Sequence, residues 1–252
     1  MKDNFFSVIT PVYNGEKFIE KTILSILNQK FTNFEYIIVD GNSTDTTHKI
    51  IKKYSKQINK IIIENDDGMY DAIDKGINNS NGQFIIWVNS DDLLVDENVL
   101  LNLYNFFSKK KIEWVTGRVS FIKNDNLKIF SFLPYIYPQS IIQKGLAHGC
   151  FWGFVQQEST VFSRNIYNKV GGFNKSLKMA GDFDLWQKFS FITKLHSCNI
   201  LIGAQRRWSG QMQNDLVYYY NEIGKKKCII SIFKSIRLIV SLILFPYIFF
   251  KK

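Results

Sequence analysis

The sequence predicts an α/β fold in which a mostly parallel sheet is flanked by helices. Strand-like and helix-like segments alternate through the first third of the chain, which is the pattern of a parallel sheet with helices on both faces. The strand-like segments are continuous apolar runs, as expected where both faces of a sheet are covered. With 252 residues, of which 46% are hydrophobic, the chain can bury a sizeable core, and this composition excludes a disordered chain.

Four strands and three helices make up this pattern. The strands are runs rich in β-branched and aromatic residues, and the first of them is expected to end at Pro11. The first helix carries apolar residues at helical spacing between Phe18 and Leu27. The expected strands cover residues 5–10, 34–39, 58–64 and 84–88, and the expected helices cover residues 16–29, 46–55 and 71–78.

Positive charge is concentrated at the end of the chain. The formal net charge is +10, but seven basic residues and no acid lie in residues 225–252. The first 224 residues therefore carry only +3, which excludes a strongly basic nucleic-acid-binding protein. We expect one domain over residues 1–224, with halves at 1–100 and 101–224, and a basic, apolar tail over residues 225–252.

The tail is predicted to bind a membrane surface. Residues 228–250 are apolar except for five polar residues that fall near one helical stripe. The most apolar part, residues 238–250, contains Pro246 and is shorter than the ~20 residues that a single span needs. We expect an amphipathic helix in the membrane plane, with residues 225–227 attracted to anionic lipid at the cytoplasmic face. The alternative is a helix that packs on the domain or on a partner.

Polar clusters follow three of the four strands. Asp40 comes directly after the second strand, and Asp91 closely follows the fourth. Ligands of open α/β sheets bind outside the carboxyl ends of the strands, so these two acids are expected to share a cleft. The alternative interpretation is that Asp, Asn and Gly at these places are ordinary turn residues.

Asp91 and Asp92 are adjacent carboxylates at the end of a very apolar strand. Like charges this close repel, and burial increases the cost, so a divalent cation would offset both effects. Mg²⁺ and Mn²⁺ prefer carboxylate oxygen and usually take one or two protein carboxylates together with substrate phosphates. The pair therefore indicates a metal–diphosphate site. Alternatively, Asp92 caps a helix that starts near Asp96, and Asp91 is solvated.

Several short motifs occur along the chain in a specific order. They are SVITPVYN at 7–14, VDGNSTD at 39–45, DDGMYDA at 66–72, KG at 75–76, NSDD at 89–92, QEST at 157–160, GGF at 171–173 and GDFDLW at 181–186. Their order and spacing closely resemble those of the nucleotide-sugar domain of family 2 glycosyltransferases, which have the GT-A fold. The resemblance covers roughly residues 5–210, and residues 1–100 would then form the nucleotide-sugar-binding half and residues 101–224 the acceptor-binding half.

The resemblance implies roles for individual residues. Asp91 would be the metal-binding acid, and Asp92 would support it or contact the diphosphate. Asp182 would be the general base, and Glu158 would lie near donor and acceptor. Independently of the resemblance, Trp152 and its aromatic neighbours could stack on an acceptor sugar or line a lipid groove, or could equally pack in the core. The implied donor-site residues, several of which line the base and ribose pocket, are Thr10, Pro11, Tyr13, Asn14, Asp40, Asp67, Lys75, Asn89, Ser90, Asp91 and Asp92. Arg207 is added to the donor site from its charge alone, as argued below.

Three departures from the family pattern limit what it implies. Asn89 stands where many members have the first Asp of the metal motif, although an amide can still bond a ribose hydroxyl. Gly41 replaces an Asp that reads the base in some members, so UDP, GDP and dTDP donors all stay open. Residues 205–208, QRRW, are one residue short of the signature of processive synthases, so no polymerase is inferred.

The chemistry of glycosyl transfer matches these residues. A cation held by Asp91, Mn²⁺ or Mg²⁺, would stabilise the departing nucleoside diphosphate, and Arg206 or Arg207 could add positive charge or could be surface residues. Asp182 would take the proton of the acceptor hydroxyl. Considered alone, it would be interpreted as a helix N-cap, and the family resemblance reverses that preference. A single base implies direct displacement and therefore inversion at the anomeric carbon.

The expected protein is thus a metal-dependent, inverting glycosyltransferase. It would move one sugar to a saccharide or lipid-linked acceptor in surface polysaccharide or O-antigen biosynthesis, at the cytoplasmic membrane face. One alternative is a sugar-phosphate nucleotidyltransferase, which should carry a glycine-rich phosphate loop after the first strand, where residues 10–15 have only one Gly. Another is a membrane-bound scaffold of the same fold without activity.

Overall fold

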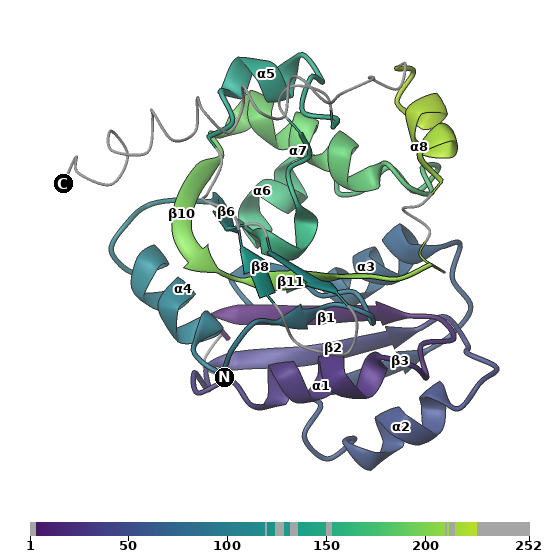
Figure 1. Ribbon diagram of the computed structural model, residues 1–252. Coiled ribbons are helices and arrows are strands. Elements are labelled where there is room, and N and C mark those ends of the chain that lie inside the picture. Colours follow the sequence, from purple (N-terminus) through teal and green to yellow (C-terminus); the bar gives the residue numbers. More distant parts are fainter. Residues whose placement is uncertain are drawn as a thin grey trace.

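A large, mostly parallel sheet lies between two layers of helices in the computed structural model, in agreement with the predicted fold class (Figure 1). Helices α1 (Ile19–Leu27) and α2 (Thr47–Lys53) lie on the lower side of the sheet in this view, and α7 (Gly181–Ile192) lies on the upper side. The structure describes residues 4–118, 120–123, 129–131, 136–149, 153–209, 211 and 215–225.

The described elements follow one another with short connections through the first half of the chain. The strands are β1 (Phe6–Val12), β2 (Phe34–Asp40), β3 (Lys60–Ile63), β4 (Phe84–Trp87), β5 (Leu93–Leu94), β6 (Trp114–Arg118), β7 (Ser120–Lys123), β8 (Ile129–Ser131), β9 (Thr160–Ser163), β10 (His196–Leu201) and β11 (Gly203–Arg207). The remaining helices are α3 (Met69–Asn78), α4 (Val99–Phe107), α5 (Gln139–Gln143), the 3₁₀ turn η1 (Gln157–Ser159), α6 (Arg164–Lys169) and α8 (Leu216–Glu222).

The large sheet has seven strands in the order β10-β6-β9-β4-β1-β2-β3. Strands β1 to β4 are parallel to one another, as the sequence predicts, and β1 and β2 pair in register from Phe6 with Phe34 to Val12 with Asp40. Strand β9 is antiparallel to both β4 and β6. The loops after β1, β2, β3 and β4 therefore meet at one edge of the sheet.

Strand β1 continues through Pro11 to Val12, so the prediction that it ends at Pro11 is wrong. The amide of Val88 donates to the carbonyl of Ile9, which places the backbone groups of Ile9 on the β4 side of β1. Because these groups alternate between the two sides of a strand, the nitrogen of Pro11 also faces that side. Strand β4 has ended there at Trp87, so the missing N–H costs no ladder hydrogen bond.

Alternate residues of β1 contribute to two separate cores. Val8 packs with residues of α1, α2 and α4 on one face of the sheet, whereas Ile9 packs with residues of α3 and α7 on the other. On the second face, the indole of Trp186 in α7 stacks between those of Trp87 and Trp114, with ring centroids 5.7 and 5.6 Å away. These buried aromatic contacts fix α7 against the sheet, and with it the first turn of that helix.

A smaller sheet places β11 beside the end of β4. Its strand order is β5-β11-β7-β8, and β11 pairs antiparallel with β5 and parallel with β7. Gly203 in β11 lies so close to the backbone of Glu158 that a Cβ atom there would collide with it. The close approach brings Arg206 and Arg207 to the acidic residues that follow β4.

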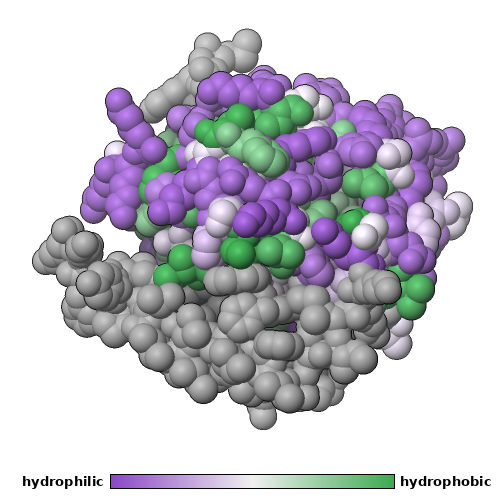
Figure 2. Space-filling view, turned by 90° about the horizontal axis from the view of Figure 1, so that it is seen from above, coloured by the Kyte–Doolittle hydropathy of each residue, from purple (hydrophilic) through white to green (hydrophobic). Residues whose placement is uncertain are grey.

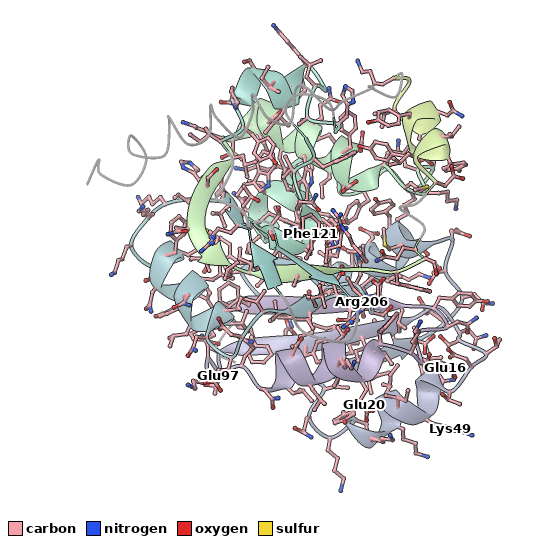
Figure 3. All side chains as sticks on the ribbon, in the orientation of Figure 1. Glu16, Glu20, Lys49, Glu97, Phe121 and Arg206 are labelled. Atoms are coloured by element: carbon pink, nitrogen blue, oxygen red, sulfur yellow. The ribbon has the colours of Figure 1, made fainter. Side chains whose placement is uncertain are left out.

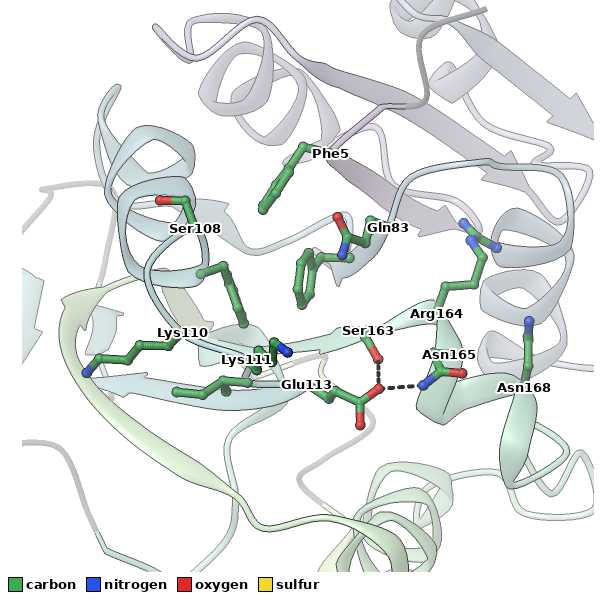
Figure 4. Close-up of a pocket in the computed structure, with 13 residues that line it drawn as sticks. Phe5, Gln83, Ser108, Lys110, Lys111, Glu113, Ser163, Arg164, Asn165 and Asn168 are labelled. Carbon is green, nitrogen blue, oxygen red and sulfur yellow. Dashed lines mark hydrogen bonds between the residues drawn. The ribbon is translucent and has the colours of Figure 1, made fainter.

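The described part of the face seen from above in Figure 2 is mainly hydrophilic, with separate hydrophobic groups between the polar side chains. A pocket of about 770 Å³ opens at the start of β1 and β4, where Phe5 and Phe84 line it and Glu113 accepts hydrogen bonds from Ser163 and Asn165 (Figure 4). This pocket lies at the edge of the sheet opposite the acidic residues.

Candidate active site

The loops after β1 and β2 are tied together by hydrogen bonds. The amide of Asn14 donates to Oγ of Ser43 over 2.8 Å, and the amide of Thr44 donates to Oδ1 of Asn14 over 2.8 Å. The amide of Gly15 donates to Oγ1 of Thr47 over 2.9 Å. Asn14 has a φ of 50°, a left-handed conformation that asparagine tolerates better than most residues. Asn14 therefore organises the loop in which the sequence places the base and ribose pocket.

Asp40 is completely buried at the end of β2. Its Oδ1 accepts a hydrogen bond from the amide of Ser43 over 2.8 Å. Its Oδ2 lies 2.9 Å from Nε2 of His48, which is 36% exposed. Asp40 thus connects the loop after β2 to α2, and His48 is a neighbour that the sequence did not single out.

Three further predicted donor-site residues belong to β1 or follow it directly. Thr10 is buried, and its hydroxyl accepts a hydrogen bond from the hydroxyl of Tyr36 over 3.2 Å. Pro11 lies in β1 opposite Val39, whereas Tyr13 lies beyond the strand and is 63% exposed. An exposed aromatic ring next to a buried polar strand end is available to stack on a planar ligand.

The space next to Gly41 is filled by an acid from another loop. A Cβ atom on Gly41 would collide with Oδ2 of Asp66, whose Oδ1 accepts a hydrogen bond from the amide of Gly68 over 2.9 Å. Burial raises the pKa of Asp66. The carboxylate that the family pattern leads one to expect at residue 41 is thus absent there, and the carboxylate of Asp66 lies beside the same backbone position.

Lys75 and Asp67 shape the loop after β3. The ammonium of Lys75 lies 3.2 Å from Oε1 of Glu64, 3.0 Å from Oδ2 of Asp71 and 2.7 Å from the carbonyl oxygen of Asn65. The amide of Asp67 donates to Oδ2 of Asp71 over 3.2 Å. In this arrangement the side chain of Lys75 is bound to the loop itself.

Asp92 is buried at the end of β4, with only 2% of its surface exposed. Its Oδ1 accepts a hydrogen bond from the amide of Arg206 over 2.9 Å, and its Oδ2 lies 3.4 Å from Nδ2 of Asn89. The hydroxyl of Thr22 in α1 lies within 2.8 Å of the carbonyl oxygens of both Ser90 and Asp92. The strand end is therefore held rigidly between α1 and β11.

Burial raises the pKa of Asp92 well above its usual range, and the charges of Asp91 and Glu158 add to the effect. Helix α4 begins at Val99, and the Asp92 carboxyl faces β11, so the alternative in which Asp92 caps a helix near Asp96 is wrong. The two adjacent carboxylates therefore have different surroundings, because Asp91 is only half-buried.

Asp91 is bound by the segment that follows β11. Its Oδ2 accepts hydrogen bonds from Nε1 of Trp208 over 2.8 Å and from Nε2 of Gln211 over 2.9 Å. Its carbonyl oxygen accepts a hydrogen bond from Nε of Arg206 over 2.9 Å. The ring of Trp208 packs edge-on against Phe18, with centroids 5.3 Å apart. Trp208 and Gln211 are contacts that the sequence did not predict, although the QRRW pattern drew attention to this segment.

The two neighbouring arginines point in different directions. Arg206 is 4% exposed, and its guanidinium lies 4.6 Å from the ring centroid of Phe18. The guanidinium of Arg207 lies over the ring of Phe121, 3.8 Å from its centroid. Its positive charge partly offsets the rise in the pKa of Glu158 that burial causes. Figure 3 shows Arg206 and Phe121 on the upper side of β1, on the side away from Glu16 and Glu20. Both cations are thus near the acidic residues.

Glu158 is buried between the donor side and the acceptor side of the site. It is 2% exposed in η1, and its Oε1 has no hydrogen-bond partner among the described residues. Burial raises the pKa of Glu158 to about 8, and the charges of Asp182 and Asp91 contribute in the same direction. Because the charges of Asp91 and Asp182 both act on Glu158, the three carboxyls belong to one site.

Asp182 lies in the first turn of α7, directly after the helix start. Its Oδ1 accepts a hydrogen bond from the amide of Phe183 over 2.8 Å and lies 3.3 Å from the hydroxyl of Tyr70. Burial raises the pKa of Asp182 to about 6. Asp184 instead pairs with Lys188 over 2.7 Å on another side of the helix. The helix begins before Asp182, so the alternative role as its N-cap is wrong.

Helix α8 holds the segment that leads into α7. Oε1 of Glu222 accepts a hydrogen bond from the amide of Lys178 over 2.6 Å, and its Oε2 accepts from the amides of Met179 and Ala180, both over 2.9 Å. These three N–H groups precede α7, which carries Asp182. Glu222 therefore anchors the start of the helix, another role that the sequence did not indicate.

The acceptor side is described in part. Trp152, predicted to bind the acceptor, lies outside the described residues. Nearby, His148 is buried, and its carbonyl oxygen accepts a hydrogen bond from the hydroxyl of Tyr220 over 2.9 Å. Phe154 packs edge-on against Tyr219, with centroids 5.5 Å apart. Aromatic side chains from α8 thus line the region next to Asp182.

The acidic pair suits a magnesium or manganese ion that shares its shell with a ligand. In the part of the chain that the structure describes, no group of three His, Cys, Asp or Glu side chains could hold a metal by itself. Such ions usually need only one or two carboxylates together with water and substrate phosphates. Among the described residues, no donor bonds Oδ1 of Asp91. Burial and the charges of Asp91 and Glu158 raise the pKa of Asp92, and a cation beside these acids would offset this repulsion and favour the ionised carboxylates.

Sequence comparison shows which proteins are similar to this chain. The model of the family described as Glycosyl transferase family 2 matches residues 7–171. An uncharacterized glycosyltransferase of Rickettsia typhi is 29% identical over 230 residues, covering 85% of this chain and 69% of that protein. The putative teichuronic acid biosynthesis glycosyltransferase TuaG of Bacillus subtilis is 29% identical over 161 residues, covering 61% of this chain and 63% of that protein.

Solved structures share the fold. Residues 1–349 of S. aureus TarS in complex with UDP-GlcNAc match with a TM-score of 0.66 and 20% identity, covering 83% of this chain and 60% of that one. The mannosyltransferase PcManGT from Pyrobaculum calidifontis in complex with GDP-Man and Mn²⁺ matches with a TM-score of 0.64 and 16% identity, covering 90% of this chain and 66% of that one. The chain thus spans 60 to 69% of the length of these four proteins.

Proposed function

The chain belongs to glycosyl transferase family 2, and on that premise we propose that it is a metal-dependent, inverting enzyme. It would transfer one sugar from a nucleoside-diphosphate sugar to a saccharide or lipid-linked saccharide. Two structural neighbours were solved with UDP-GlcNAc and with GDP-Man and Mn²⁺, respectively, which supports this class of donor and cation. UDP-, GDP- and dTDP-sugars all remain candidates, because Gly41 lacks a side chain that could select a base.

One observation carries the proposal. The carboxyl of Glu158 is buried against β11, the strand whose Arg206 bonds Asp91 and Asp92, and the charges of Asp182 and Asp91 both act on it. A donor-side acid and an acid of raised pKa thus share one site at the carboxyl edge of the sheet, where open α/β sheets bind their ligands. This is the arrangement that a transfer reaction between two bound substrates needs.

The donor side would stabilise the departing nucleoside diphosphate. Asp91 would hold the cation with its carboxylate, and Asp92 would support this position from its buried site on the amide of Arg206. When bound, Mg²⁺ or Mn²⁺ supplies a Lewis acid for the diphosphate oxygens. The exposed guanidinium of Arg207 is placed to add positive charge at the same side.

The acceptor side would remove a proton from the attacking hydroxyl. Burial raises the pKa of Asp182 to about 6, so the carboxylate is mostly ionised at neutral pH yet more basic than an ordinary aspartate. Asp184 is paired with Lys188, which leaves Asp182 as the base on this turn. A single base without a second nucleophile favours direct displacement, and hence inversion of the anomeric centre.

The proposed pathway is the assembly of a cell-surface polysaccharide or O-antigen. The name of the Bacillus subtilis relative places that protein in teichuronic acid biosynthesis, which supports this assignment. No helix among the described residues is long and apolar enough to cross a membrane. We propose that residues 225–252 hold the enzyme at the cytoplasmic membrane face; apart from Lys225, these residues lie outside the described part.

Calorimetric titration tests the donor site. UDP, GDP and dTDP are titrated, with and without Mn²⁺, into the wild-type protein and into the Asp91→Ala variant. We expect one nucleotide to bind in a metal-dependent manner and this binding to be lost in the variant. Absence of binding of all three nucleotides to the folded wild-type protein would remove the donor site and favour a scaffold without activity.

A further inference from the structure

The indole of Trp208 connects two parts of the donor side. Its Nε1 donates a hydrogen bond to Oδ2 of Asp91 over 2.8 Å. Its ring packs edge-on against Phe18, at the start of α1, and the ammonium of Lys17 lies 5.1 Å from the Trp208 ring centroid. One side chain therefore contacts both the loop after β1 and the acid that follows β4.

Gln211 adds a second donor to the same oxygen atom. Its Nε2 lies 2.9 Å from Oδ2 of Asp91. Its Oε1 accepts a hydrogen bond from the amide of Trp208 over 3.2 Å, so the two side chains are fixed relative to each other. One carboxylate oxygen thus receives two N–H groups, whereas no donor among the described residues bonds Oδ1 of Asp91.

The chemistry of these donors matters for a metal site. Indole and amide N–H groups are uncharged, so they orient the carboxylate without neutralising it. An arginine or lysine in the same position would compete with a cation for the negative charge. Hydrogen bonds to a metal-binding carboxylate fix its orientation and are part of the design of many metal sites.

We propose that Trp208 and Gln211 are positioning residues that orient the carboxylate of Asp91 for a divalent cation bound together with the donor diphosphate. The inference rests on the proposed function. It assigns a role to the last residue of the QRRW pattern that is independent of any processive synthesis. The segment after β11 would then set how strongly the cation contributes to nucleotide binding.

Two variants separate positioning from packing. Trp208→Phe keeps an aromatic ring against Phe18 and Lys17 but removes the N–H group. Gln211→Met keeps a side chain of similar length but removes the second donor. Nucleotide affinity is measured by calorimetry, with and without Mn²⁺, for the nucleotide that binds the wild-type protein among UDP, GDP and dTDP. Circular dichroism and thermal melting confirm that each variant is folded.

The expected result is a selective loss of the metal effect. The double variant combines Trp208→Phe with Gln211→Met. In it, the increase in affinity caused by Mn²⁺ should fall by about tenfold or more, which is the usual effect of removing hydrogen-bond partners of a metal ligand. Affinity without metal should remain close to that of the wild type, because the base and ribose contacts lie elsewhere. Asp91→Asn serves as the reference for complete loss of the metal effect.

Two other outcomes would overturn the inference. If the Mn²⁺-dependent increase is the same in the wild type and the double variant, the two residues do not position Asp91. If affinity falls equally with and without Mn²⁺, the segment only packs against the nucleotide loop. A wild-type protein that shows no metal-dependent nucleotide binding would instead refute the proposed donor site, and this inference with it.

Discussion

The hydroxyl of Tyr70 lies 3.3 Å from Oδ1 of Asp182 and 3.0 Å from the carbonyl oxygen of Met179. Tyr70 belongs to α3, so this contact joins the nucleotide half of the sheet to the helix that carries the proposed base. A hydrogen bond to a carboxylate favours its ionised form and therefore counteracts the effect of burial. Burial raises the pKa of Asp182 to about 6, against the lowering effect of the hydrogen bonds from the Phe183 amide and the Tyr70 hydroxyl.

We expect the rate of transfer to rise with pH through about 6 and to level off above neutral pH. Asp182 can accept a proton only when its carboxyl is ionised, and burial places its pKa at about 6. The rate constant at saturating substrate is measured between pH 5 and 8. An acidic limb near pH 4, the ordinary range of an aspartate, would argue against a buried base at this position.

Replacing Tyr70 with Phe should move this acidic limb to higher pH. The variant keeps the ring that packs against Gly181 but loses the hydroxyl that stabilises the ionised carboxylate. A hydrogen bond of ordinary strength corresponds to a shift of roughly half to one pH unit. The pH profile of the variant is compared with that of the wild type, and a shift to lower pH would contradict the proposed role of the hydroxyl.

Asp182→Asn should reduce the turnover rate by at least about 100-fold, because a general base contributes that much or more. Nucleotide binding should persist, since Asp182 lies on the acceptor side of the site. The matched control is Asp184→Asn, two residues away in the same turn, which loses only a pair with Lys188. Equal losses of turnover in the two variants would indicate damage to α7 and no specific role of Asp182.

Local patterns were sufficient to predict most of the first half of the fold. The strands β1 to β4 are apolar runs separated by single short helices, so composition and spacing predict a parallel sheet. They do not predict the full strand order, because β4 lies beside β1 and not beside β3. Pro11 misled the prediction because the effect of a proline depends on which side of the strand its nitrogen faces. Strand β5 has only two residues, and a pairing that short leaves no recognisable pattern.

Site residues that belong to a short motif could be predicted from the sequence. Site residues whose role depends on partners far away in the chain could not. The acidic residues follow strands, so their meeting at one edge could be expected from topology. The contacts of Asp91 with Trp208 and Gln211 join residues 117 and 120 positions apart. Such contacts depend on the register of β11, which neither hydropathy nor spacing reveals. Asp66 was missed because its contact with Gly41 joins the loops after β2 and β3, and the pattern of the sequence does not reveal such a contact.

Glu222→Ala should lower turnover more than it lowers nucleotide affinity. The variant leaves the amides of Lys178, Met179 and Ala180 without their carboxylate partner, so the start of α7 loses its anchor. Asn221→Ala, on an exposed neighbouring residue of α8, is the control. Kinetic constants and nucleotide affinity are measured for both variants. A pure loss of nucleotide affinity would show that α8 does not act through Asp182.

Gly41→Ala should destabilise the protein, and the cost should depend on Asp66. The added Cβ would collide with Oδ2 of Asp66, and the carboxylate can move only by giving up its hydrogen bond to the amide of Gly68. We expect a loss of about 1 kcal/mol in the free energy of unfolding, in the lower range for overpacking. Truncating the colliding side chain with Asp66→Ala should make the same Gly41 substitution nearly neutral. Denaturant unfolding of the wild type, both single variants and the double variant forms a complete cycle. If the cost of Gly41→Ala is unchanged in the Asp66→Ala background, the two residues are not in contact, and the carboxylate of Asp66 does not fill the space beside residue 41.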